Sequence, residues 1–221
     1  MPSWSDKLKP MRCDLKPLMP EADAAYLAAE RAANLMPGLP VDLKHTTKAQ
    51  RRQFLDIRQA KTAADLLERL PEPDEAFHCV AGGRFAMWDI VPAVLFRAKP
   101  RTIESLTIAT LGFSKNNADA LCKLLDEKQI GRVTVLCSHY FSATSKDILK
   151  HMVAGMEHRG QTLAIRRSHA KILAMKLTGG QTMTVEASSN LRSSKNCENM
   201  SFFGDPALYQ FHTRWIEEIC K

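Results

Sequence analysis

The stretch "LTIATLGFSKNNADALCKLLDEKQIGRVTVLCS", residues 106–138, decides the class of fold. Both of its ends are apolar runs rich in Ile, Val and Thr, which favour strands. Its middle has apolar residues at helical spacing after Ser114, a residue suited to an N-cap. A strand, a helix and a strand in succession predict a βαβ unit with parallel strands.

The residues on either side continue this alternation. The expected elements are strands over 76–82 and 162–167, and helices over 84–98, 142–159 and 205–221. The predicted fold class for residues 73–221 is therefore α/β: a mixed, largely parallel sheet flanked by helices. In such sheets ligands bind where the strands end, at their carboxyl ends.

Residues 1–72 predict a separate, basic helical extension. Residues 19–36 are Ala-rich with apolar residues at helical spacing, and residues 47–70 repeat the pattern until "PEPDE" stops it. The basic run in the second of these helices suits either a phosphate backbone or an ordinary solvated face; its members are Lys48, Arg51, Arg52, Arg58 and Lys61. The extension could serve as a clamp, a dimerisation arm or a docking surface.

Composition favours a soluble protein with a polyanionic partner. The chain has 221 residues, 45% of them hydrophobic and 25% charged, and a net charge of +7. This charge suits nucleic acid or an anionic lipid surface, although solubility alone also accounts for it. The apolar stretch 85–96 contains Asp89 and Pro92 and is too short to cross a bilayer. No signal peptide is expected, so the predicted location is the cytoplasm, without membrane attachment.

The six cysteines do not predict a disulfide framework or a metal site. None forms a Cys-x-x-Cys pair, and several stand in apolar runs, as small core residues do. Cys137 and His139 come nearest to a metal pair, but further ligands at suitable spacing are missing. We expect neither a metal nor a cofactor.

A hairpin is predicted where Gly179-Gly180 separates two β-rich runs, 169–178 and 181–190. A two-residue turn at the glycines places Lys171 opposite Ser188 and His169 opposite Asn190. Because alternate residues of a strand share a face, all four side chains are then expected on one face of the sheet. A shift of one residue would send the two pairs to opposite faces.

These four residue types together suit a phosphate group. An imidazole can act as nucleophile or proton carrier near neutral pH. Lysine neutralises an anionic oxygen, while the asparagine amide and serine hydroxyl add neutral hydrogen bonds. Four basic residues flank the group and are expected to bind substrate: Arg166, Arg167, Arg192 and Lys195.

The segments "HAK" and "SSNLRSSKNCEN" resemble the His-x-Lys and Ser-x-Asn elements of the phospholipase D superfamily. Residues 106–138 resemble its strand, helix and strand, so the resemblance covers residues 77–221. The superfamily usually has Asp where this chain has Lys176, which makes the chain similar to the His-Lys-Asn pattern of tyrosyl-DNA phosphodiesterases. For the carboxylate that orients His169, the candidate is Glu198, with Glu186 as the alternative.

The resemblance implies a two-step, metal-independent phosphodiester exchange through a phosphohistidine, with two His-x-Lys motifs in one active site. This chain has one such motif, at His169 and Lys171, so the resemblance implies a homodimeric site. Its catalytic residues would be His169, Lys171, Asn190 and Glu198. Single-motif members of the superfamily include small bacterial nucleases.

The predicted function is therefore that of a nuclease acting on DNA or RNA. The principal alternative is a phospholipase D-like module that binds nucleic acid without cutting it, suggested by the missing Asp. A lipid-acting enzyme and a structural or assembly protein are further alternatives. The first would hydrolyse phospholipids in vesicles, and the second would neither bind nor cut nucleic acid.

Overall fold

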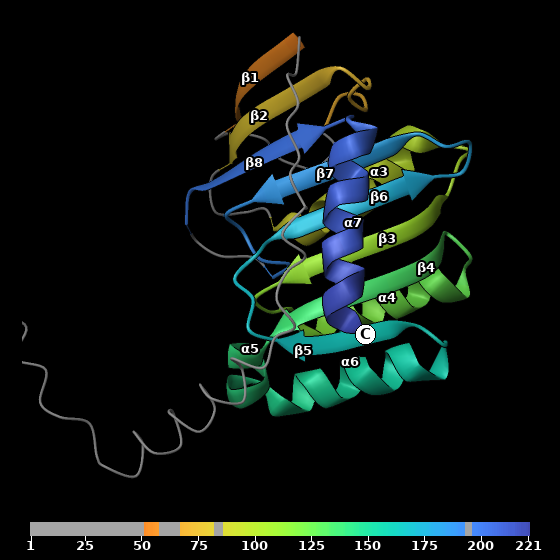
Figure 1. Ribbon diagram of the computed structural model, residues 1–221, viewed down its shortest axis with the longest axis vertical. Coiled ribbons are helices and arrows are strands. Elements are labelled where there is room, and N and C mark those ends of the chain that lie inside the picture. Colours follow the sequence, from red (N-terminus) through yellow and green to blue (C-terminus); the bar gives the residue numbers. More distant parts are fainter. Residues whose placement is uncertain (1–50, 58–66, 82–85, 193–195) are drawn as a thin grey trace, which may run out of the picture. The chain divides into compact units, whose positions relative to one another are not determined.

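In the computed structural model, residues 51–57, 67–81, 86–192 and 196–221 are described. They form a mixed sheet with helix α7 on one face and helices α3 and α4 on the other (Figure 1). The strands, in their order across the sheet, are β1 (Arg51–Ile57), β2 (Glu75–Ala81), β8 (Glu198–Phe203), β7 (Thr182–Ala187), β6 (Ile172–Leu177), β3 (Ile103–Thr110), β4 (Ile130–Ser138) and β5 (Thr162–Arg166). The helices are η2 (Met87–Asp89), α3 (Ile90–Ala98), α4 (Lys115–Asp126), α5 (His139–Thr144), α6 (Lys146–His158) and α7 (Pro206–Cys220).

The predicted α/β class, a mixed sheet flanked by helices, is confirmed, but the sheet is not largely parallel. Strands β3, β4 and β5 are parallel, as the opening stretch predicts, and β1 is parallel to β2. The other four pairings of the described strands are antiparallel. After β5 the chain forms a hairpin, and short connections between neighbouring strands make them antiparallel.

The helix expected over residues 47–70 is wrong for Arg51–Ile57, which form β1 and pair with β2. Backbone pairing with a neighbouring strand has here outweighed local helix propensity. Residues 67–70 are not helical either. The other helix expected in the extension, over 19–36, lies outside the described residues.

The core lies on the face of the sheet that carries α3, α4 and α6. Val135, Ile108, Leu173 and Val185 follow one another across four neighbouring strands, and all four are fully buried. Ser114 caps α4 as expected, since its hydroxyl accepts a hydrogen bond from the backbone N–H of Asn117 at 3.1 Å. The predicted βαβ unit is thus built as the sequence indicates.

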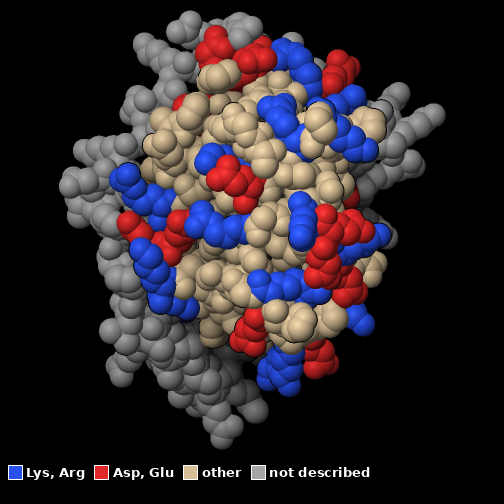
Figure 2. Space-filling view, turned by 90° about the vertical axis from the view of Figure 1, so that its right-hand side faces the viewer, with Lys and Arg blue, Asp and Glu red and all other residues tan. Residues whose placement is uncertain are grey.

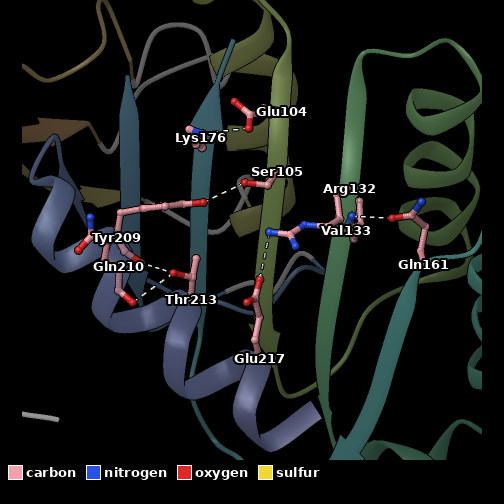
Figure 3. A network of polar contacts seen from close by, with 10 residues as sticks. All are labelled: Glu104, Ser105, Arg132, Val133, Gln161, Lys176, Tyr209, Gln210, Thr213 and Glu217. Atoms are coloured by element: carbon pink, nitrogen blue, oxygen red, sulfur yellow. Dashed lines mark hydrogen bonds and ion pairs between the residues drawn. The ribbon is translucent and has the colours of Figure 1, made fainter. Parts of the chain in front are cut away.

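Helix α7 covers the other, more polar face of the sheet. Asp205 caps its first turn and Pro206 occupies its first position, which explains where the helix begins. Ser105 and Tyr209 share a hydrogen bond of 2.9 Å between strand and helix, and Arg132 pairs with Glu217 at 3.3 Å (Figure 3). Polar contacts therefore help to fix this helix on the sheet.

The predicted hairpin is present, but its register differs by one residue. The observed pairing sets Ile172 opposite Glu186, whereas a two-residue turn would set it opposite Ala187. The loop contains Thr178 as well as the glycines, because Leu177 N–H donates to Gln181 O at 2.8 Å. Both glycines have positive φ, 96° and 92°, a conformation that favours glycine.

Candidate functional site

The described site residues lie in or beside the strand ends that are drawn on the left in Figure 1, at one edge of the sheet. Strands β3, β4, β5 and β7 end at this edge, while β6 and β8 begin there. Strands β5 and β6 are separated in the sheet by β4 and β3. The connection of residues 167–171 must therefore cross the ends of two strands, and it carries His169 and Lys171 across them.

His169 and Lys171 are in direct contact. The Lys171 Nζ atom lies 2.7 Å from His169 Nδ1, and it donates to the His169 carbonyl oxygen at 2.8 Å. The Nζ atom is also 3.3 Å from Nε2, so the amino group lies within reach of both ring nitrogens. Burial lowers the pKa of Lys171, and the negative charge of Glu198 raises it in opposition.

Ser188 and Glu198 form the second pair. The Ser188 hydroxyl donates to the Glu198 carboxylate, and it accepts from the backbone N–H of Asn199 at 3.1 Å. Ser188 follows the last residue of β7, and Glu198 is the first residue of β8, so two neighbouring strands fix this pair. The charge of Glu198 also acts on Lys171 of the first pair.

Asn190 is held at the carboxyl end of β3. Its Oδ1 accepts from the backbone N–H of Leu111 at 3.2 Å, and its carbonyl oxygen accepts from Met87 N–H at 3.0 Å. Leu191 N–H then donates to the Thr110 hydroxyl at 3.4 Å. Because its oxygen is used by the backbone, Asn190 can offer its Nδ2 hydrogens to a ligand.

His169, Lys171, Ser188, Asn190 and Glu198 thus stand at one edge of the sheet, and we call them the edge cluster. The predicted opposition of Lys171 with Ser188 and of His169 with Asn190 is wrong, because the register is shifted by one residue and the pairing of β6 with β7 ends at Ile172 and Glu186. All four residues stand beyond the paired positions. Their proximity follows from the strand ends meeting at one edge, not from a shared face.

Glu186, the alternative carboxylate, lies elsewhere. His212 Nε2 is 2.8 Å from Glu186 Oε1, between α7 and the sheet. Trp215 Nε1–H donates to His212 Nδ1 at 3.0 Å, so that nitrogen carries no proton and Nε2–H donates to Glu186. We call Glu186, His212 and Trp215 the helix-face cluster. Glu198 is therefore the carboxylate that belongs to the edge cluster.

The flanking basic residues are spread along the edge. Arg166 ends β5, three strands away from β6, and its Nη1 donates to the Ile165 carbonyl at 3.0 Å. Burial raises the pKa of the Cys220 thiol to about 11, and the positive charge of Arg166 lowers it in opposition. Arg167 and Arg192 are exposed, and Lys195 lies outside the described residues.

Lys176, which stands where the superfamily has Asp, is also remote from the edge cluster. It pairs with Glu104 at 2.9 Å on the face covered by α7 (Figure 3). Lys176 stands four positions after Ile172, a distance of roughly 13 Å at the usual rise. Lys176 is therefore not part of the edge cluster.

Sequence reasoning missed two sets of contacts. One is at the end of β3, where the Thr110 hydroxyl and the backbone N–H of Leu111 bind the Ser-x-Asn segment. The other is the pairing of Glu186 with His212, which depends on how α7 crosses the sheet. Neither has a local sequence signal, since both join segments far apart in the chain.

Two other kinds of feature are absent from the part of the chain that the structure describes. Among those residues, no three His, Cys, Asp or Glu side chains lie together as a metal site would require. None of the helices in the described ranges combines the length and the apolar character that a membrane crossing needs. The described cysteines, Cys79, Cys122, Cys137, Cys197 and Cys220, are free thiols.

No protein-family model matches the chain, and no curated protein matches it. Among solved structures it is similar to Nuc, a phospholipase D family member from Salmonella typhimurium, at 16% identity and a TM-score of 0.44, over 65% of this chain and 94% of that one. It is also similar to a polyphosphate kinase from Porphyromonas gingivalis (11%, TM-score 0.49, 73% of this chain and 27% of that one). A third is phosphatidylserine synthase from Haemophilus influenzae Rd KW20 (13%, TM-score 0.46, 65% and 38%). The chain thus spans most of the first protein and well under half of the other two.

Proposed function

We propose that this protein is a metal-independent phosphodiesterase that cuts nucleic acid, acting in the cytoplasm through the edge cluster of a homodimer. The observation that carries the proposal is the contact of His169 with the Lys171 amino group, 2.7 Å from Nδ1, beside the Ser188–Glu198 pair. A neutral imidazole has the lone pair that a nucleophile needs, and the neighbouring ammonium can neutralise a phosphate oxygen.

In the first proposed step, an imidazole nitrogen of His169 attacks phosphorus, so an N–P bond forms and the P–O bond to the leaving group breaks. The leaving oxygen takes its proton from the histidine of a second copy of the chain. Water, deprotonated by that second histidine, then attacks phosphorus and the N–P bond breaks. Lys171 and Asn190 donate to the non-bridging oxygens throughout, and Ser188 joins them when its hydroxyl turns from Glu198 to the phosphate. The charge of Glu198 favours the ammonium form of Lys171.

The second copy is part of the proposal because the sequence has one His-x-Lys motif. A monomer would offer one such histidine where the mechanism uses two. The basic balance of the chain, +7, favours nucleic acid as the substrate over a neutral lipid surface.

The test is cleavage of end-labelled single- and double-stranded DNA and RNA in the presence of EDTA. The wild-type chain is expected to cut at least one of the four, and His169→Ala none. His158→Ala is the matched control, because His158 is also exposed but ends α6 at the opposite edge of the sheet. If no substrate is cut while labelled DNA still shifts at low salt, the protein is a binding module and the catalytic proposal fails.

Light scattering tests the homodimer separately. We expect a mass twice that of the 24.8 kDa chain at micromolar concentration. A monomer that cuts nucleic acid in EDTA would contradict the shared site, and it would require a second proton carrier within one chain.

A further inference from the structure

Tyr140 is the most exposed of the large hydrophobic residues in the described part of the chain, at 63%. It is the second residue of α5, which starts directly after the last residue of β4. Tyr140 therefore stands at the same edge of the sheet as the edge cluster, where β3, β4 and β5 end (Figure 1).

The backbone under this ring is fixed. Ser138 caps α5 by accepting from Tyr140 N–H at 3.3 Å. The next residue, Phe141, is buried and packs on Phe113 with ring centroids 4.7 Å apart. It also lies so close to Gly112 that a Cβ there would be 2.4 Å from its ring. The exposed Tyr140 is thus held in place by the buried ring of its neighbour Phe141, which we call the aromatic anchor.

That anchor connects Tyr140 to the edge cluster. Gly112 and Phe113 directly follow Leu111, whose N–H holds the Asn190 side chain. In addition, the connection that carries His169 crosses the ends of β3 and β4. Adjacent strands are about 4.8 Å apart, so the end of β4 lies roughly 10 Å across the sheet from the start of β6. This separation suits a phosphate in the edge cluster and a base one nucleotide away.

Charge along this edge suits the backbone of such a strand. Lys115 is exposed at the first position of α4, which begins beside the end of β3. Arg167 is exposed after β5, and Arg192 is exposed after the Ser-x-Asn segment. The edge therefore combines exposed cations with one exposed aromatic ring, the combination that binds single strands.

We infer that Tyr140 is a stacking platform for an unpaired base of a single-stranded nucleic acid whose phosphate occupies the edge cluster. The inference rests on the proposed function and names its substrate class. Both faces of a base in a duplex are covered by its neighbours, so a ring exposed at the surface selects a base that is free to unstack.

The test is a binding measurement that requires no turnover, made by fluorescence anisotropy in the His169→Ala background. Two labelled strands of equal length are compared, one with bases and one abasic, so that their phosphates are the same. Tyr140→Ala is expected to lower the affinity ratio of base-carrying to abasic strand roughly tenfold, and Tyr140→Trp to retain it. Phe96→Ala is the matched control, because Phe96 is 55% exposed beside Arg97 and Lys99 but stands near the opposite edge.

An unchanged ratio in Tyr140→Ala would overturn the inference, and so would an equal loss of affinity for both strands. A change from dimer to monomer in Tyr140→Ala would also overturn it, because the ring would then be a subunit contact. Cleavage separates the two proposals. If the wild type does not cut nucleic acid, but Tyr140→Ala lowers the affinity ratio, the catalytic proposal fails and the stacking inference holds. If the wild type cuts and Tyr140→Ala leaves the ratio unchanged, the stacking inference fails and the catalytic proposal holds.

Discussion

The edge cluster and the helix-face cluster both contain a histidine and a glutamate, and Glu186 and Glu198 belong to adjacent strands. In the helix-face cluster His212 is 7% exposed, and both of its ring nitrogens have a hydrogen-bond partner. In the edge cluster His169 is exposed, and its contact is the cation of Lys171. A buried, satisfied histidine stabilises a fold, whereas an exposed histidine beside an ammonium is suited to an anion.

The two edges of the sheet differ in how their charged side chains are paired. At the edge opposite the edge cluster, Lys and Arg lie side by side with Asp and Glu (Figure 2). Helices α4 and α6 end there, with Arg159 pairing with Asp126 at 2.7 Å and Lys123 with Glu127 at 3.7 Å. Exposed pairs of this kind contribute little to stability and leave little net field. The candidate site lies where a histidine and a lysine stand together instead.

The largest effect is expected from His169→Ala. Loss of the nucleophile should lower cleavage at least about a thousandfold, while the melting temperature stays within a degree or so of wild type. Both are measured on one preparation, by oligonucleotide cleavage and by thermal unfolding. A large fall in melting temperature with cleavage retained would show that the edge cluster stabilises the fold and does not act in catalysis.

Asn190→Ala should lower both cleavage and stability, because Asn190 is proposed to bind phosphate and also holds the backbone N–H of Leu111. We expect cleavage to fall about a hundredfold, from loss of a donor to phosphate, and stability to fall by about 1 kcal/mol, since Leu111 N–H loses its partner. Asn190→Asp is the control: it keeps an acceptor for Leu111 but puts a carboxylate beside the phosphate. Equal stability of the Ala and Asp variants would show that the Leu111 contact is unimportant.

His212→Ala should do the reverse of His169→Ala. It removes the hydrogen bond from His212 to Glu186 and the acceptor of the Trp215 N–H, which should cost about 2 kcal/mol and lower the melting temperature by roughly 4–8 °C. Cleavage per folded molecule should be retained. Loss of cleavage in a variant that remains folded would place His212 in the active site and remove the contrast between the clusters.

Glu198→Gln should shift the titration of Lys171. The charge of Glu198 raises the pKa of Lys171, so its removal lets Lys171 lose its proton at lower pH. NMR of the lysine side chains over a pH series, with Lys171→Arg to assign the signal, is expected to show this shift. Glu104→Gln, on the face covered by α7, should leave the Lys171 titration in place; a shift in the opposite direction for Glu198→Gln would contradict the assignment.

The smallest effect is expected from Lys176→Met. This residue and Glu104 are 37% and 52% exposed, so the loss of their pair should cost less than about 1 kcal/mol in denaturant unfolding. Cleavage should be unaffected, because Lys176 is far along the strand from the edge cluster. A loss of cleavage would show that the motif position still acts on the site despite its distance.

The sequence predicts those parts of the fold that depend on local patterns. Three features could be predicted: the βαβ unit over 106–138, the Ser114 cap and the presence of the hairpin. They depend on the spacing of apolar residues and on capping residues, which are local in the sequence. The hairpin register was not, since Thr178 joins the loop and no pattern in the strands marks it. Strand β1 was missed because its partner is remote in the chain.

The grouping of the candidate site residues depends on where the strands end, and not on the predicted pairing. The group of His169, Lys171, Ser188 and Asn190 meets at one edge although the register is wrong, because strands that end at that edge bring their following residues together. The contact of Asn190 with Leu111 and the separation of Glu186 from Glu198 depend on tertiary packing. Such contacts need the sheet order, which the sequence alone did not supply.

In the proposed mechanism His169 becomes covalently attached to phosphorus. The most direct measurement is mass spectrometry of peptides after the protein reacts with an oligonucleotide in EDTA and is quenched in alkali, where an N–P bond survives. A nucleotide mass on the peptide that contains His169, absent from His169→Ala, is the predicted result. Cleavage by His169→Ala at the wild-type rate, or a nucleotide bound to another residue, would contradict it.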